Sequence, residues 1–359
     1  MKKILLHTIF PGCLNGPNTV NRLIRESNLL QDSFVIEDLN QTTLPGKNPF
    51  KFIKLIYDLK KDIVGRGADA IIVTGLQFAG FCCTLAAKLA HIKRIVVCVH
   101  GYAGDDNNLS PIMRWLFNNI VEPWTIRLCD SVYTVCEYGA NRHMMKKYAR
   151  GKLYGTIHNC FPNPVEKAQE GIRKKLGIDK EKVVIASVGR VTEDKGHREI
   201  INALKMGLSD EAVFIVVGDG NYLNHYTEEC QNLIEEGRLI LLGQRDDVLD
   251  ILLETDIFVF PTYHENLSMA LLEACYSRCA VVATDVDGNP EVIKNGISGL
   301  LIEKKNAKAL HDAMNELIHN EKERTILSNN AFYYQQNEFS YQVFQERIKT
   351  MLEKQFEEE

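Results

Sequence analysis

The chain has 359 residues, more than a single hydrophobic core usually supports, so we expect two domains. Its composition, 45% hydrophobic and 25% charged, is ordinary for a soluble enzyme, and no apolar run reaches the roughly 18 residues of a transmembrane helix. The ten cysteines form no C-x-x-C pair. This pattern argues against zinc or disulfide frameworks and favours reduced, mostly buried thiols in a cytoplasmic protein.

Charge is divided unevenly along the chain, although the net value is only −5. Residues 1–165 carry 20 Lys and Arg against 12 Asp and Glu, whereas residues 166–359 carry 22 against 35. A basic half joined to an acidic half suggests that the first domain faces an anionic surface. The densest basic stretch follows an apolar, aromatic helix at 111–117, and either a solvated loop or contact with an anionic membrane fits it. Its cations are Arg142, Lys146, Lys147, Arg150 and Lys152.

Apolar strand-like runs alternate with helical patterns, which is typical of parallel sheets built from β-α-β units. In the first half we expect strands at 3–10, 33–37, 70–74, 95–100 and 131–135, and helices at 19–30, 50–66, 79–90 and 112–128. In the second half we expect strands at 183–188, 213–217, 239–242, 257–260, 280–284 and 299–302. The chain is therefore predicted to be an α/β protein with two Rossmann-like domains.

The junction between the domains is expected near residues 158–164, where two prolines and two asparagines break any regular element. We place the first domain at 1–163 and the second at 164–340. Residues 341–359 form a separate closing segment, mostly helical.

The stretch from Tyr263 to Ala274 is the most informative part of the chain. Glu265 follows the strand at 257–260, and the carboxyl ends of such strands are where open α/β sheets bind ligands. Helical spacing after Ser268 places Glu273 one to two turns into the next helix, so both carboxylates can face one ligand. A loop acid and a solvated helix acid would be the alternative reading of an isolated pair.

Together with a second motif upstream, this segment resembles a known enzyme family. Residues 261–302 and the run from Val183 to Gly196 resemble the donor site of retaining, GT-B-fold glycosyltransferases of family 4. The resemblance implies two Rossmann-like domains facing across an interdomain cleft, with the closing helix crossing back to the first domain. It also implies that Arg190 and Lys195, which follow Gly189, grip the donor diphosphate, where fixed cations favour its departure.

The same resemblance implies roles for the two glutamates and their neighbours. Glu265 would contact the donor sugar and Glu273 the ribose of the nucleotide. Backbone amides near a helix N-terminus would hold sugar hydroxyls or phosphate. These amides belong to Asn266, Leu267 and Ser268.

Further candidates lie in loops after other strands. Gly12 and Gly16 lie in a loop that leads into the first helix, where a close approach to donor phosphate or acceptor is possible and a plain turn is the alternative. His100 ends a strand where similar enzymes carry a histidine that contacts the donor sugar. Gln244 and Arg245 resemble the segment that reads the nucleobase, although Arg245 could simply face water.

Two motifs indicate whether the protein uses a dinucleotide or a metal ion. The loop at 217–221 has two glycines but lacks the third glycine of a dinucleotide fingerprint, which disfavours an NAD oxidoreductase. Asp285 and Asp287 match the D-x-D of metal-dependent transferases, but they lead into a Gly-Asn-Pro-Glu turn as in metal-free relatives. We therefore expect no metal and no cofactor besides the donor. Asn289 stands where similar enzymes commonly have a second glycine.

The predicted function is retaining transfer of a sugar from a nucleoside diphosphate sugar, preferably a UDP-sugar, to a glycan acceptor. A lipid-linked polysaccharide precursor at the cytoplasmic face of a membrane is the preferred acceptor, and no nucleic acid partner is expected. A nucleotide-sugar epimerase or hydrolase would instead turn over the donor without an acceptor. A non-catalytic partner subunit would be expected to lack Arg190, Lys195 or Glu265, and all three are present.

Overall fold

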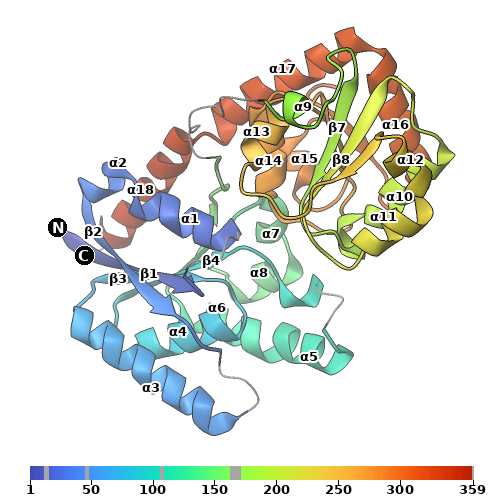
Figure 1. Ribbon diagram of the computed structural model, residues 1–359. Coiled ribbons are helices and arrows are strands. Elements are labelled where there is room, and N and C mark those ends of the chain that lie inside the picture. The colour runs from blue at the N-terminus through green and yellow to red at the C-terminus, as the bar shows by residue number, and fades with distance from the viewer. Residues whose placement is uncertain (12–15, 45–47, 106–108, 162–170, 358–359) are drawn as a thin grey trace. The chain divides into compact units, whose positions relative to one another are not determined.

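The computed structural model describes residues 1–11, 16–44, 48–105, 109–161 and 171–357, and the chain divides into two compact units. Unit 1 comprises Met1–Cys160 and Tyr341–Glu359, and unit 2 comprises Phe161–Ser340. The division falls three residues before the expected boundary at 163, and the last helix belongs to the first unit. Each unit is a sheet covered by helices (Figure 1).

Unit 1 contains a parallel sheet of six described strands in the order β2-β1-β3-β4-β5-β6. The strands are β1 (Lys2–Ile9), β2 (Phe34–Gln41), β3 (Ala70–Thr74), β4 (Arg94–Val99), β5 (Ser131–Thr134) and β6 (Leu153–Thr156). The sequence did not predict β6, because four residues interrupted by Gly155, whose φ is +130°, give no alternating pattern. The inner strands β3, β4 and β5 are almost wholly buried, as expected for a parallel sheet covered on both faces.

Helices connect these strands. They are α1 (Gly16–Arg25), α2 (Asn28–Gln31), α3 (Pro49–Arg66), α4 (Phe78–Leu89), η1 (Ala103–Asp105), α5 (Pro111–Leu116), η2 (Phe117–Val121), α6 (Glu122–Leu128), α7 (Glu137–Ala140) and α8 (His143–Tyr148). The predicted helix at 112–128 is therefore a composite of α5, the π-helical turn η2 and α6. None of the described helices is both long enough and apolar enough to cross a bilayer.

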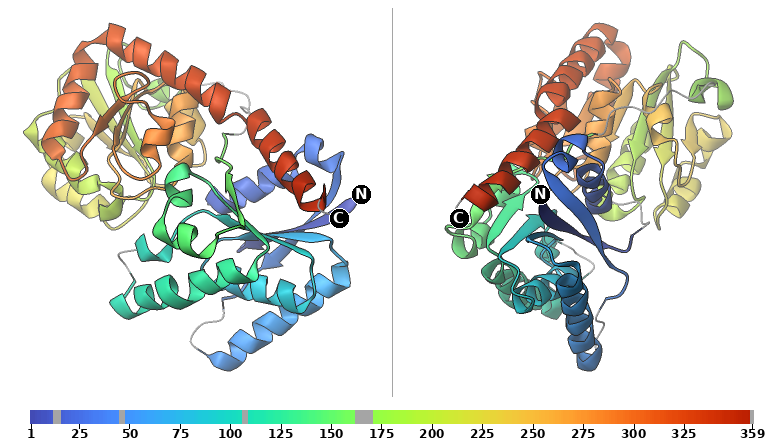
Figure 2. Two further views of the ribbon diagram at one scale, coloured as in Figure 1. Left: turned by 180° about the vertical axis from the view of Figure 1, so that it is seen from behind. Right: turned by 90° about the vertical axis from the view of Figure 1, so that its left-hand side faces the viewer.

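The closing helix α18 (Tyr341–Glu357) packs on unit 1. Its Gln345 accepts a hydrogen bond from Ser27 Oγ at 2.6 Å, and its Phe356 ring lies 6.3 Å from that of Phe34. Lys2 Nζ lies 5.3 Å from the centre of the same Phe356 ring, so the end of α18 lies beside the start of β1 (Figure 2). Aromatic and hydrogen-bonding contacts therefore attach the end of the chain to its beginning.

Unit 2 repeats the design with a parallel sheet of six described strands in the order β12-β11-β10-β7-β8-β9. Its strands are β7 (Val183–Val188), β8 (Ala212–Val217), β9 (Leu239–Leu241), β10 (Ile257–Phe260), β11 (Ala280–Thr284) and β12 (Leu300–Ile302). Its helices are α9 (Ile172–Lys175), η3 (Glu193–Lys195), α10 (His197–Met206), α11 (Leu223–Glu229), α12 (Gln231–Glu235), α13 (Val248–Leu252), α14 (Met269–Tyr276), α15 (Asn289–Val292), α16 (Ala307–His319) and α17 (Glu321–Glu338). The prediction of an α/β protein with two Rossmann-like domains is confirmed.

Candidate functional site

The loop that follows β7 carries two of the predicted cations. It begins at Gly189, whose φ of +147° suits glycine, and continues through Arg190 to Lys195 at the end of η3. Gly196 then turns the chain into α10 with φ +75°. A Cβ at Gly196 would lie 2.0 Å from the carbonyl oxygen of Pro261, so only glycine lets this loop approach the loop after β10 so closely.

Hydrogen bonds hold these two loops together. The carbonyl oxygen of Asp194 accepts the backbone N–H of Tyr263 at 2.9 Å and the hydroxyl of Thr262 at 3.2 Å. Below them, the Tyr263 hydroxyl donates to the buried carboxylate of Glu199 at 2.6 Å. The relative position of Lys195 and Glu265 is therefore set by backbone geometry and by a buried polar pair.

Lys195 and Glu265 come together as an ion pair. Lys195 Nζ lies 2.8 Å from Glu265 Oε2, and the two side chains are 18% and 19% exposed. The Lys195 ammonium also lies 5.6 Å from the centre of the Phe260 ring at the end of β10. An ammonium has three donors, so the pair leaves Lys195 with capacity for a further anion.

The backbone of Glu265 is clamped by the turn after β11. Asp287 Oδ2 accepts the N–H of Glu265 at 3.0 Å, and the N–H of Gly288 donates to the carbonyl of Glu265 at 3.0 Å. Asp287 has φ +48°, a strained conformation for a residue with a side chain, whereas Asp285 is exposed. In this arrangement Asp287 orients Glu265, a role that the sequence reasoning did not give it.

Glu273 lies in the second turn of α14, as predicted. Ser268 caps this helix by accepting the N–H of Leu271 at 3.3 Å, and Asn266 and Leu267 come directly before it. Desolvation among buried neighbours raises the pKa of Glu273 to about 7. Within the described part of the chain no hydrogen bond or ion pair engages its carboxyl group, so its oxygens remain available to a ligand.

Arg190, Gln244 and Arg245 are more exposed. The Arg190 side chain is 64% exposed and lies 3.1 Å from Asp194. Arg245 forms two hydrogen bonds with Asp247, at 2.8 and 2.6 Å, beside the exposed Gln244. The structure therefore places Arg190 at the same loop as Lys195, but turned toward an acid of its own loop.

The loops after β7, β8 and β9 meet at the carboxyl edge of the sheet. Gly189 donates to Val217 at 3.0 Å, and Gly218 donates to Gly243 at 2.8 Å. A Cβ at Gly218 would lie 1.8 Å from the Gly189 carbonyl oxygen, which requires glycine there. Gly189 and the segment of Gln244 and Arg245 thus belong to one edge with Lys195.

In unit 1, His100 directly follows β4. Burial lowers its pKa to about 4, so the imidazole is neutral near pH 7, and its Nε2 lies 3.2 Å from Cys98 Sγ. Gly16 is the first residue of α1, whereas Gly12 lies outside the described residues. A neutral His100 can donate or accept a hydrogen bond to a sugar hydroxyl, but it supplies no positive charge.

The predicted basic cluster is only partly available to an external anion. Arg142 pairs with Asp105, with Nη2 to Oδ1 at 2.9 Å, and stacks 4.2 Å from the centre of the Tyr102 ring. Lys152 Nζ donates to the carbonyls of Arg127 and Cys129 at 2.7 and 2.6 Å. The remaining cations, Lys146, Lys147 and Arg150, are exposed.

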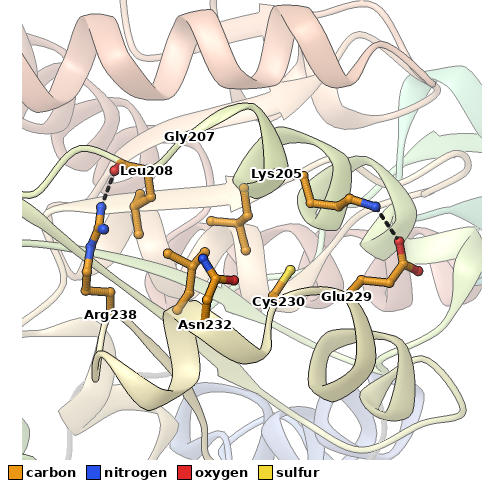
Figure 3. Close-up of a pocket in the computed structure, with 9 residues that line it drawn as sticks. Lys205, Gly207, Leu208, Glu229, Cys230, Asn232 and Arg238 are labelled. Atoms are coloured by element: carbon orange, nitrogen blue, oxygen red, sulfur yellow. Dashed lines mark hydrogen bonds and ion pairs between the residues drawn. The ribbon is translucent and has the colours of Figure 1, made fainter.

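A separate pocket of about 330 Å³ lies in unit 2 beside the end of α10 (Figure 3). An ion pair between Lys205 and Glu229 at 2.9 Å crosses one side of it, and Arg238 donates to the carbonyl of Leu208 on the other. Leu208 precedes β8 and Arg238 precedes β9. The pocket therefore lies toward the amino ends of strands, away from the edge that carries Lys195 and Glu265.

Comparison with known proteins shows which family the region containing Lys195, Glu265 and Glu273 resembles. Residues 168–333 match the family model described as glycosyl transferases group 1. The chain is 29% identical over 299 residues to the N,N'-diacetylbacillosaminyl-diphospho-undecaprenol alpha-1,3-N-acetylgalactosaminyltransferase of Campylobacter jejuni, covering 79% of this chain and 75% of that protein. It is 27% identical over 320 residues to the UDP-Gal:alpha-D-GlcNAc-diphosphoundecaprenol alpha-1,3-galactosyltransferase of Escherichia coli, covering 82% and 79%.

Solved structures show the same fold. The HepE protein of Anabaena, crystallised with UDP and glucose, superposes with a TM-score of 0.76 at 18% identity, covering 98% of this chain and 100% of that one. A glycosyltransferase from Rickettsia africae gives 0.75 at 18% identity, covering 99% of both chains. At such identities the likeness establishes the architecture alone.

Proposed function

From its membership of the group 1 glycosyltransferases, with the GT-B fold, we propose that this enzyme transfers a sugar, with retention, from a UDP-sugar to a lipid-linked diphosphate glycan. The main support for placing the donor site in unit 2 is the ion pair between Lys195 and Glu265 at the carboxyl edge of its sheet, where Nζ lies 2.8 Å from Oε2. Open α/β sheets bind their ligands at this edge.

In the proposed reaction, the bond between the anomeric carbon and the diphosphate oxygen breaks, and its electron pair remains on the diphosphate. Lys195, with Arg190 from the same loop, stabilises this growing negative charge. The acceptor hydroxyl oxygen bonds to the anomeric carbon on the face that the diphosphate leaves, and its proton passes to the departing phosphate oxygen. The transition state has oxocarbenium character, and Glu265 remains bound to the sugar while that state forms.

Other residues bind and orient the donor in this proposal. The carboxyl group of Glu273, which no other described residue engages, accepts hydrogen bonds from the ribose hydroxyls. The backbone around Asn266, Leu267 and Ser268, before α14, receives sugar or phosphate oxygens. Gln244 and Arg245 contact the base, and Gly189 lets the donor approach the backbone. In unit 1, neutral His100 bonds the sugar, and the segment of Gly12 and Gly16 meets donor or acceptor.

The acceptor and the donor base are supported by the two relatives. Both are named for α-1,3 transfer to a sugar on diphospho-undecaprenol, and one is named for UDP-galactose. A product with an α linkage from a donor whose sugar is also α-linked corresponds to retention. We infer the same class of acceptor for this chain and leave the sugar unassigned.

The test combines binding with turnover. UDP-sugars and GDP-sugars are screened for protection against thermal unfolding, because a ligand that binds only the native state raises its stability. The stabilising donor is then incubated with a short-chain polyprenyl-diphosphate sugar, and the product is examined for linkage and anomeric configuration. Stabilisation by GDP-sugars alone, or a β-linked product, would contradict the proposal. Equal donor turnover with and without acceptor would support a hydrolase or epimerase instead.

A further inference from the structure

Large apolar side chains line one exposed surface of unit 1. Ile112 and Trp115 of α5 are 78% and 59% exposed, Ile120 of η2 is 41% exposed, and Trp124 of α6 is 50% exposed. The chain has two tryptophans, and both belong to this set, which we call the tryptophan stripe. As far as the described residues extend, nothing in unit 1 buries these side chains, although Phe117 and Val121 of the same segment are buried.

The π-helical turn explains why these residues share one surface. Residues advance by about 100° in an α-helix but by only roughly 80° in a π-helix, where hydrogen bonds span five residues. A continuous α-helix would turn Ile120 and Trp124 away from Ile112 and Trp115. Because η2 spans the five residues Phe117–Val121, it rotates α6 back, and the stripe occupies roughly a third of the helix circumference.

Cations adjoin the tryptophan stripe directly. The Arg127 guanidinium lies 5.4 Å from the centre of the Trp124 ring and 4.6 Å from that of Tyr148 in α8. Lys147 lies 5.0 Å from the same Tyr148 ring, and Lys146 is also exposed. Aromatic–cation contacts therefore connect the stripe on α6 to the basic surface of α8, by which we mean Lys146 and Lys147 together with Arg150 just after the helix.

We propose that the tryptophan stripe, together with the basic surface of α8, docks the enzyme on an anionic lipid bilayer. Indole rings combine an apolar body with a polar N–H and favour the boundary between lipid and water. Neighbouring lysines and arginines add an attraction to anionic headgroups that weakens beyond about 10 Å at 0.1 M salt. An amphipathic surface of this kind binds reversibly in the plane of the interface.

Charge favours a bilayer over a second copy of the chain. In a symmetric dimer the same patch meets itself, so Arg127, Lys146 and Lys147 of both copies would approach one another and repel. An anionic membrane complements both the apolar stripe and the cations. The biological purpose of this docking, delivery of a lipid-linked acceptor, rests on the proposed function, but the docking itself is independent of it.

Because both tryptophans belong to the stripe, intrinsic tryptophan fluorescence reports directly on whether this surface contacts lipid. The wild-type chain is mixed at low salt with vesicles of phosphatidylglycerol and phosphatidylcholine, some carrying brominated acyl chains. We expect a blue shift of tryptophan emission, quenching by the brominated chains, and loss of both as salt rises or when phosphatidylcholine is used alone. Co-sedimentation with vesicles without any change in emission would overturn the proposal, because another surface would then be bound. Failure to bind at low salt, or a blue shift without vesicles that accompanies doubling of the mass, would also overturn it.

Matched variants distinguish binding through the tryptophan stripe from non-specific binding through any exposed apolar side chain. Ile112→Ser with Trp115→Ser should weaken vesicle co-sedimentation by roughly tenfold or more. Ile297→Ser with Tyr333→Ser removes two side chains of similar exposure, 61% and 60%, from unit 2 and should leave it unchanged. Circular dichroism and thermal unfolding confirm that each variant is folded. Equal weakening by both pairs would refute the assignment of the stripe.

Charge is tested in the same way. Reversal of Lys146, Lys147 and Arg150 to Glu should abolish co-sedimentation. Reversal of the exposed Lys180, Lys304 and Lys322 of unit 2, the same change in net charge, should have little effect. All variants should transfer sugar to a water-soluble acceptor at the wild-type rate. If the wild type itself transfers nothing in solution, the proposed function fails while the docking result stands.

Discussion

Asp287 and Glu265 are joined by a hydrogen bond of 3.0 Å, in which the carboxylate of the first accepts the backbone N–H of the second. The sequence led us to expect only a turn at the D-x-D pair, and the bond gives one of its two carboxylates a further role, that of orienting a site residue. The Nδ1 of His264 lies 3.6 Å from the same Asp287 oxygen. The turn after β11 is thus a support for the loop after β10.

We predict that Asp287→Ala lowers kcat at least tenfold, because Glu265 loses the contact that orients it. Asp287→Asn should retain most of the activity, since the amide oxygen can still accept the same N–H. Exposed Asp285→Ala, two residues away, is the matched control and should behave like wild type. Steady-state kinetics with varied donor concentration measure the effect, and equal losses in the Ala and Asn variants would contradict a positioning role.

The second prediction concerns the Lys195–Glu265 pair. Lys195→Ala and Glu265→Gln should each reduce transfer at least a hundredfold, corresponding to about 3 kcal/mol in the barrier. Since the two groups contact each other, the double variant should lose much less than the product of the single losses. Near-normal transfer by either folded single variant would remove that residue from the site.

The third prediction concerns Arg190→Ala, which should separate an effect on catalysis at the diphosphate from an effect on the stability of the fold. Its side chain is 64% exposed, so removing it should barely change the melting temperature, in contrast to its effect on transfer. We expect transfer to fall roughly a hundredfold, by analogy with the loss of one donor to a developing anion. Thermal unfolding and kcat of the same preparation decide the matter. A parallel loss of stability and activity would assign Arg190 to the fold.

Metal independence is the fourth prediction. Chelation by EDTA should leave the initial rate within about twofold, because Lys195 and Arg190 supply the charge that a metal would otherwise provide. The engagement of Asp287 with the Glu265 N–H supports this expectation. Loss of activity with EDTA and its recovery with Mn²⁺ or Mg²⁺ would return Asp285 and Asp287 to the role of ligands.

The sequence predicted the sheet of unit 2 better than the contacts of its site. Every strand of that sheet was expected, because buried parallel strands are read as continuous apolar runs bounded by turn residues. The hydrogen bond of Asp287 to Glu265 spans 22 residues and depends on a positive φ, which no local pattern reveals. Likewise, the partners of Arg142 and Lys152 come from other elements, so charge counting alone treated both as free.

The last prediction concerns the pH dependence of donor binding. The pKa of Glu273 in the free protein is about 7, raised from 4.5 by desolvation. If its carboxylate accepts hydrogen bonds from the donor ribose, binding favours the ionised form, so donor affinity should rise from pH 6 to about 7 and flatten toward pH 8. Affinity should be measured with an intact nucleotide sugar, because the free nucleoside diphosphate ionises in the same range.

Glu273→Gln provides the control for this pH dependence. The amide does not ionise, so the variant should bind donor more weakly at pH 8 and with an affinity that no longer changes between pH 6 and 8.

The stability of the protein tests the raised pKa of Glu273 independently, and its pH dependence should have the opposite sign. Because folding raises the pKa of Glu273, its stabilising contribution is complete below about 4.5 and is lost as pH rises toward 7. The free energy of unfolding should therefore fall over that range in the wild type, and less so in Glu273→Gln. A wild-type donor affinity that is flat from pH 6 to 8 would remove Glu273 from the ribose site, even if the stability difference were observed.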